Sequence, residues 1–163
     1  RYVLPDAPSP NLPNERSILL YPNLCLFEGT LVSVGRGTSF TFQCIGLPDP
    51  NAGNFVFTPT SRKGASDPLY KGKICYGIDF SKLSVDSLFK NQKLDFTSIL
   101  DLYTKLGRPN DFFLKNGFFD KLVGNEKLRN AILSGKTMEE IRASWEADLT
   151  HFKAIRKKYL LYP

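Results

Sequence analysis

The stretch "LFEGTLVSVGRGT", residues 26–38, lies where two β-rich runs of the chain meet. The two runs, 24–34 and 39–46, contain many β-branched and aromatic residues and predict two strands. The Gly-Arg-Gly turn between them predicts a hairpin or an adjacent pair. Farther along, 54–59 and 73–80 predict two more short strands. The N-terminal half of the chain therefore predicts a small β-sheet.

Helical patterns dominate from about residue 84 onward. In 95–107 the apolar residues recur at helical spacing, and Gly107 suits the position after a helix end. The segments 118–125 and 126–135 predict two short helices. The second half of the chain is therefore expected to be helical.

The last helix has the clearest sequence signature in the chain. Thr137 and Glu140 have the spacing of a capping box, which marks a helix start. Large apolar residues then follow at helical spacing: Met138, Ile141, Trp145, Leu149, Phe152 and Tyr159. The pattern predicts a long amphipathic C-terminal helix.

The order of these elements predicts the fold class. Residues 1–14 contain four prolines and are expected to be extended and irregular. A short helix over 14–21 follows, capped by Asn14 and ended by Pro22. Strands come first and helices later, without β-α-β alternation, which is typical of an α+β fold. We expect one domain over 15–163, with a small mixed β-sheet in its N-terminal half, helices packed on the sheet, and the long C-terminal helix.

Composition excludes several classes of protein. The net charge of +6 is dispersed, and its one concentrated patch is 153–158. Most of the phenylalanines fit core patterns, so a nucleic-acid partner is not expected. No apolar run approaches the roughly 18 residues that span a membrane. Cys25, Cys44 and Cys75 are too widely spaced for a zinc site and are expected to be small buried thiols, with a disulfide between two of them as the open alternative. We therefore expect no metal and no cofactor.

The opening stretch also holds the best candidate for a functional site. Glu28 and Arg36 are the only charged residues between Arg16 and Pro48. Glu28 follows an apolar run, so its carboxylate is expected either to be paired or to line a cleft. The residues allow two interpretations. An ion pair between Glu28 and Arg36 could brace a β-turn, or the segment could grip a sugar or carboxylate. Three hydroxyls could contribute to the second: Thr30, Ser33 and Thr38.

Several longer motifs resemble one known family, in the family's order and over nearly the whole chain. They are "PSPNLP" (8–13), "YPNLCLFEGT" (21–30), "VSVGRGT" (32–38), "F-x-x-IG" (42–46), "KGKICYG" (71–77), "FFDKLVGN" (118–125) and "FKAIRKKYLLY" (152–162). The chain resembles the C-terminal domain of the NamZ family, bacterial exo-β-N-acetylmuramidases. The resemblance implies an enzyme that removes terminal N-acetylmuramic acid from peptidoglycan fragments.

The resemblance also implies an architecture. The family is expected to place an N-terminal Rossmann-like domain before this one, with the active site in the cleft between them. Residues 1–14 would then be the linker from that missing domain, and this half alone would be inactive. Muramic acid saccharides and the N-terminal domain would be the partners, and the implied location is the periplasm or the outside of a bacterial cell.

The matching motifs carry the candidate site residues over to this chain. Glu28 is the candidate catalytic carboxylate, because glycoside hydrolysis usually needs two carboxylic groups across the scissile bond. The candidate substrate-binding residues are Asn11, Thr30, Ser33, Arg36 and Thr38. The resemblance does not fix their individual roles. Two alternatives stay open: a non-catalytic domain that binds glycan or supports a catalytic domain, and an interaction domain that uses the basic patch at 153–158.

Overall fold

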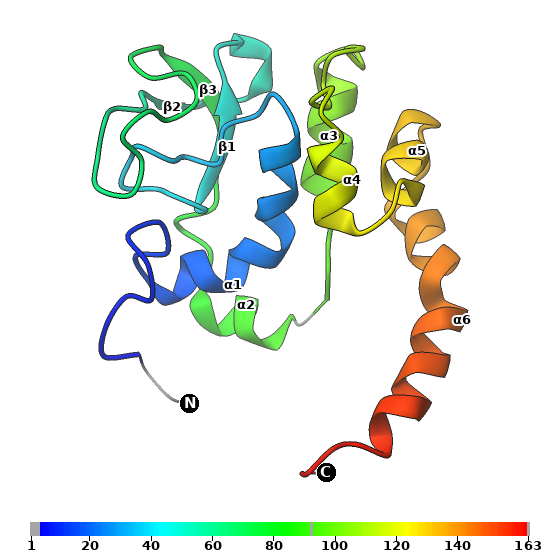
Figure 1. The fold of residues 1–163 in the computed structure, drawn as a ribbon. Coiled ribbons are helices and arrows are strands. Elements are labelled where there is room, and N and C mark those ends of the chain that lie inside the picture. The colour runs from blue at the N-terminus through cyan, green and yellow to red at the C-terminus, as the bar shows by residue number, and fades with distance from the viewer. Residues whose placement is uncertain (1–3, 92, 163) are drawn as a thin grey trace.

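The computed structural model describes residues 4–91 and 93–162 and has the expected α+β architecture (Figure 1). A small sheet lies at one end of the molecule, and the helices form the rest. In chain order the elements are α1 (Glu15–Leu24), η1 (Cys25–Gly29), β1 (Cys44–Leu47), η2 (Pro50–Ala52), β2 (Phe55–Phe57), β3 (Cys75–Asp79), α2 (Val85–Lys90), α3 (Thr97–Lys105), α4 (Phe118–Val123), α5 (Lys127–Leu133) and α6 (Met138–Lys157).

The sheet has three strands in the order β1-β3-β2, and both pairings are antiparallel. β3 lies in the centre, so the strand nearest the C-terminus is the one hydrogen-bonded on both edges. Gly46 pairs with Gly77 across β1 and β3, and a Cβ at Gly77 would collide with the Ile45 carbonyl. Glycine at this point lets the two backbones approach closely.

The predicted strand over 24–34 is wrong in its first half. The expected end of the first helix at Pro22 is also wrong: the helix continues through Pro22 as α1 and passes directly into the 3₁₀-helix η1. Leu20, Leu24 and Phe27 are all buried, and their spacing of four and three is helical, so the period of the apolar residues extends past the proline. Residues 30–34 are extended but form only isolated bridges, to Phe113 and Gly46. Of the predicted strand over 39–46, only the end belongs to β1.

The predicted helices of the second half are confirmed. α3 ends two residues before Gly107, which takes the left-handed backbone conformation expected after a helix. α4 and α5 follow, joined by an ion pair of Asp120 with Arg129. α6 begins with the predicted capping box, in which Thr137 and Glu140 bond reciprocally.

The core lies between α1, η1, the sheet and α3–α5. Its largest fully buried side chains are Phe27, Phe42, Phe112 and Phe119. α4 packs directly on η1, because Gly29 leaves room for the backbone of Phe119. Each buried side chain of this size contributes about 1.5–3 kcal/mol by leaving water.

The apolar stripe of α6 continues beyond the core. Ile141 is buried, and Trp145 packs edge-on against Phe96 with ring centroids 5.9 Å apart. Every residue from Glu146 to the end of α6 is exposed, and Phe152 is 58% exposed. A 20-residue helix is about 30 Å long and extends past the body of the domain (Figure 1). The apolar stripe therefore predicted the helix correctly. It did not predict that its second half is exposed in this chain.

Candidate functional site

The segment of residues 26–42, hereafter the glycine segment, begins in η1, which presents Glu28. η1 is held in place on two sides. The Leu114 amide donates to the Gly29 carbonyl at 2.9 Å, and the Leu31 amide donates to the Phe112 carbonyl at 2.9 Å. Gly29 itself lies against the backbone of α4, where a Cβ would collide. The position of Glu28 is therefore set by contacts with the second half of the chain.

Two glycines shape the turn that presents Arg36. Gly35 and Gly37 have φ of +75° and +80°, a region that favours glycine. A Cβ at Gly35 would lie 2.6 Å from the Cys44 sulfur, and one at Gly37 would lie 2.5 Å from the Thr60 carbonyl oxygen. Both positions therefore need glycine for conformation and for space.

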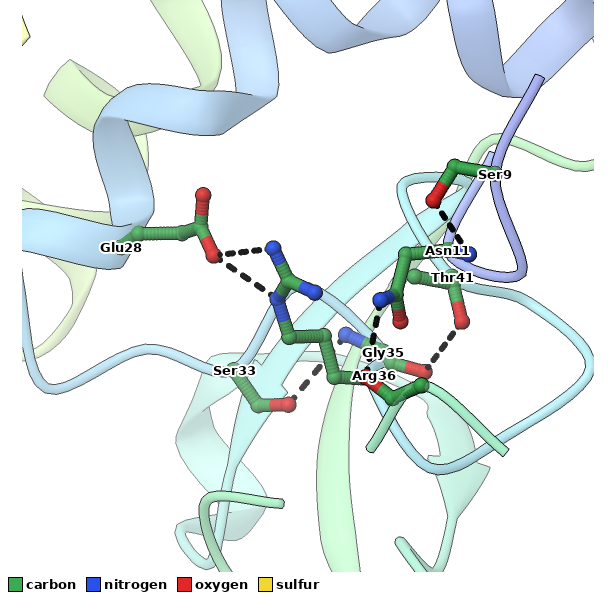
Figure 2. A network of polar contacts seen from close by, with 8 residues as sticks. Ser9, Asn11, Glu28, Ser33, Gly35, Arg36 and Thr41 are labelled. Carbon is green, nitrogen blue, oxygen red and sulfur yellow. Dashed lines mark hydrogen bonds and ion pairs between the residues drawn. The ribbon is translucent and has the colours of Figure 1, made fainter. Parts of the chain in front are cut away.

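Glu28 and Arg36 form an ion pair across this arrangement (Figure 2). Nε and Nη2 of Arg36 both donate to Oε1 of Glu28, each at 2.8 Å. The side chains are 33% and 23% exposed for Arg36 and Glu28, so the pair is half-buried. Figure 2 shows Oε2 of Glu28 turned away from the guanidinium. Among the described residues the ion pair leaves this oxygen and Nη1 of Arg36 for a ligand.

An aromatic ring supports the guanidinium from the other side. Arg36 lies over the Phe42 ring at 5.1 Å from the centroid, which is a cation–π distance. Phe42 is fully buried and has a φ of +53°, which is rare for a bulky residue and costs about 1–3 kcal/mol. Tyr21 of α1 holds the same ring edge-on at 4.8 Å. Arg36 is thus held by Glu28 and Phe42, and Tyr21 holds Phe42 in turn.

The predicted hydroxyls of the glycine segment bond within their own turns. Thr30 Oγ1 donates to the Phe27 carbonyl and accepts from the Val32 amide, and its residue is 1% exposed. Ser33 is 3% exposed and accepts from the Gly35 amide. These two buried side chains therefore stabilise the backbone turns of the segment. Thr38 also bonds locally, donating to the Gly35 carbonyl at 2.7 Å, but it is half-buried and reaches a cavity.

That cavity, of about 340 Å³, also contains Asn11. The Asn11 amide nitrogen donates to the Gly64 carbonyl at 2.8 Å, which ties the N-terminal segment to a loop 53 residues away. The same loop places Arg62 and Lys63 at the cavity. Sequence reasoning missed these two cations, although adjacent basic residues before a glycine in a polar loop were the available signal.

Tyr70 is a further positioning residue that the sequence did not reveal. Its hydroxyl donates to the Leu31 carbonyl at 2.6 Å, next to Thr30. Burial raises the pKa of Tyr70, so the hydroxyl keeps its proton and remains a donor. This bond fixes the middle of the glycine segment from the loop before β3.

The structure thus brings the six predicted residues into three groups. Glu28 and Arg36 touch one another, Asn11 and Thr38 share a cavity, and Thr30 and Ser33 are buried in the turns. Within residues 4–91 and 93–162, no three His, Cys, Asp or Glu side chains come together as metal ligands would. No helix of that described part is long and apolar enough to cross a membrane.

Comparison with known proteins now adds to this geometry. Residues 19–162 match the family model described as exo-beta-N-acetylmuramidase NamZ, C-terminal. The chain belongs to this family. It is 37% identical to the peptidoglycan beta-N-acetylmuramidase NamZ of Bacillus subtilis (strain 168), over 95% of this chain and 40% of that protein.

Two solved structures from Bacteroides fragilis NCTC 9343 also match this NamZ C-terminal domain, and both are described as DUF1343 family proteins. The first is 45% identical to this chain with a TM-score of 0.90, and the match covers 99% of this chain and 45% of that structure's chain. The second is 19% identical with a TM-score of 0.65, and the match covers 95% of this chain and 44% of that structure's chain. It shows the shared fold alone. The chain therefore spans less than half the length of the relatives that it matches.

Proposed function

We propose that this chain is the C-terminal half of a bacterial exo-β-N-acetylmuramidase and forms one wall of an active site between two domains. The substrate is peptidoglycan fragments with a terminal N-acetylmuramic acid, and the protein works in the periplasm or outside the cell. An N-terminal Rossmann-like domain supplies the other wall, and this half alone is inactive. Family membership and the identity to a named muramidase support the reaction class.

One observation carries the location of the site. The half-buried pair of Glu28 and Arg36 is the only charge on 31 consecutive residues, 17–47, and the fold holds both residues rigidly. Oε2 of Glu28 and Nη1 of Arg36 remain for a ligand. A fixed carboxylate beside a fixed guanidinium suits a substrate that offers both sugar hydroxyls and a carboxylate.

Each residue of the pair has a proposed role. Glu28 supplies one of the two carboxylic groups that glycoside hydrolysis requires, and the N-terminal domain supplies the other. Arg36 recognises the lactyl carboxylate that distinguishes muramic acid from glucosamine. Asn11 and Thr38 contribute polar groups at the cavity that they share, while Thr30 and Ser33 act through the turns that they brace.

The test uses the full-length protein and a matched ion pair. Asp120 and Arg129 form a second half-buried pair, with side chains 25% and 28% exposed, on α4 and α5. Glu28→Gln should lower kcat on a chromogenic muramide by about 10²–10⁴-fold, the range for a lost acid or base. Asp120→Asn removes a comparable pair and should leave kcat within a few-fold of wild type. A Glu28→Gln enzyme as active as the Asp120→Asn enzyme would exclude the catalytic role.

The role of Arg36 has its own comparison. Arg36→Lys keeps the charge but loses the planar fork, so binding of muramic acid should weaken about 10-fold or more while binding of N-acetylglucosamine changes little. Arg129→Lys should change neither. Equal discrimination between the two sugars before and after Arg36→Lys would overturn recognition by Arg36. A non-catalytic glycan-binding domain would keep the discrimination and show no loss of kcat in Glu28→Gln.

A further inference from the structure

α6 has an anchored half and an unpartnered half. At its start, the Phe96 amide contacts the Met138 sulfur, and Arg142 donates to the Leu94 carbonyl at 2.7 Å. Ile141 is 2% exposed. The residues 146–157, hereafter the outer half of α6, make no such contacts within the described chain and run away from the body (Figure 1).

The outer half of α6 nevertheless keeps the pattern of a buried helix. Leu149, Phe152 and Ile155 are 37%, 58% and 42% exposed, on the stripe that Ile141 and Trp145 begin. The chain after the helix is equally apolar, with Tyr159, Leu160, Leu161 and Tyr162 all exposed. A helix of about 12 residues is marginal in water without packing. A continuous apolar surface of this kind marks an interaction site.

This surface borders a groove of about 1090 Å³ between the outer half of α6 and the body. Trp145, Leu149 and Phe152 line one side of the groove. Leu94 and Cys25 line the other. Cys25 belongs to η1, the same short helix that presents Glu28. A body seated in this groove would therefore meet the element that carries the candidate catalytic carboxylate.

The charges on the helix discriminate between possible occupants. In a parallel α6–α6 pair Lys153, Arg156 and Lys157 would face their own copies, and like charges oppose that pairing. Both signs of charge line the groove, with Glu146 and Asp148 beside Lys93, Lys127, Arg142 and Lys153. A groove also has the shape for a convex protein surface and not for a flat bilayer.

We propose that the outer half of α6 and the groove beside it are the docking surface for the N-terminal domain of the full-length protein. The relatives have the length for it, since this chain covers 40% and 45% of the first two. The family matched is a C-terminal one, so the remainder precedes it. The facing surface is expected to be an apolar ridge with acidic residues opposite the basic cluster. The inference rests on the proposed two-domain architecture but not on catalysis.

The test measures thiol labelling in the native full-length protein. A cysteine is placed at Phe152→Cys or, as a matched control, at Ile74→Cys; these positions are 58% and 56% exposed in this structure. Maleimide labelling of each peptide is followed by mass spectrometry at several protein concentrations. Labelling at position 152 should be at least about 10-fold slower than at position 74, with equal rates in denaturant.

Each outcome decides the proposal. Equal native rates at positions 152 and 74 would overturn it. Protection that grows with protein concentration alongside dimer formation would assign the surface to a second copy, and protection only with anionic vesicles would assign it to a membrane. If Phe152→Cys fails to fold, Ile155→Cys on the same face answers the question. Slow labelling together with a fully active Glu28→Gln enzyme would uphold the docking surface and reject only the catalytic role.

Discussion

The glycine segment and the outer half of α6 show two opposite ways of presenting a functional surface. The glycine segment is polar, yet its hydroxyls bond within their own turns and Glu28 pairs with Arg36 of the same segment. The outer half of α6 is apolar along one stripe, yet that stripe is exposed in the described chain. The first surface is complete and can receive a small ligand. The second is incomplete and needs a macromolecule.

The largest expected effect is a difference in stability between substitutions in the two halves of α6. Ile141→Ala should lower the free energy of unfolding by about 3–4 kcal/mol, because it empties a fully buried site. Phe152→Ala removes a larger side chain but should change stability of this domain by about 0.5 kcal/mol or less, since its ring is already in water. Urea unfolding of the isolated domain, once shown to be folded by circular dichroism, measures both.

A loss of more than 2 kcal/mol in Phe152→Ala would show that the outer half of α6 packs on the body in solution. In the full-length protein the same substitution should cost more than in the isolated domain, because docking buries the ring. The loss of stability in Ile141→Ala, in the anchored half, is the reference with which the loss in Phe152→Ala is compared.

The sequence predicted best those elements whose signals lie within a few residues of one another along the chain. The helices α3 to α6 follow from spacing and caps within a few residues, and Thr137 with Glu140 marked the start of α6 correctly. The strand expected over 24–34 was wrong in its first half because Pro22 was expected to end the first helix, whereas the helical spacing of Leu20, Leu24 and Phe27 continues across it. Periodicity also cannot distinguish a stripe covered by this chain from one that needs another.

The candidate site shows the same limit. Glu28 and Arg36 were identifiable because they are isolated charges beside glycines, and their ion pair was one of the two interpretations. Arg62 and Lys63 were not, because only the folded loop brings them to Asn11. The burial of Thr30 and Ser33 depends on α4, Phe112 and Tyr70, which lie far away in the sequence.

A second prediction tests the rigidity of the glycine segment. Gly35→Ala should lower the free energy of unfolding by about 3 kcal/mol, because it adds a Cβ against Cys44 and Phe40 and forces a left-handed backbone on alanine. Gly72→Ala is the matched control: its φ of +73° is nearly equal, but no atom lies within 4 Å of its added Cβ. The control should lose only about 1 kcal/mol.

Chemical denaturation of the two variants gives the difference directly. Similar losses in both would mean that the packing around Gly35 relaxes easily, and the segment would then not be the rigid platform that holds Arg36. The muramidase activity proposed for the full-length protein should also fall in Gly35→Ala, since displacement of the turn moves Arg36 relative to Glu28.

The smallest effect concerns the thiols behind the glycine segment. Burial raises the pKa of Cys75 to about 11, and burial likewise raises the pKa of Cys44, next to Gly35. Above pH 9 the unfolded chain releases these protons while the folded chain keeps them, so the free energy of unfolding must fall as pH rises. For Cys75 the loss should be about 1 kcal/mol between pH 9 and 10, since one pKa unit corresponds to about 1.4 kcal/mol. Denaturation curves of wild type and Cys75→Ala at both pH values isolate this contribution, because the alanine variant lacks the thiol proton but shares every other titrating group. Equal pH slopes in the two proteins would mean that the Cys75 thiol ionises in the folded state as easily as in the unfolded chain, which would contradict its burial in β3.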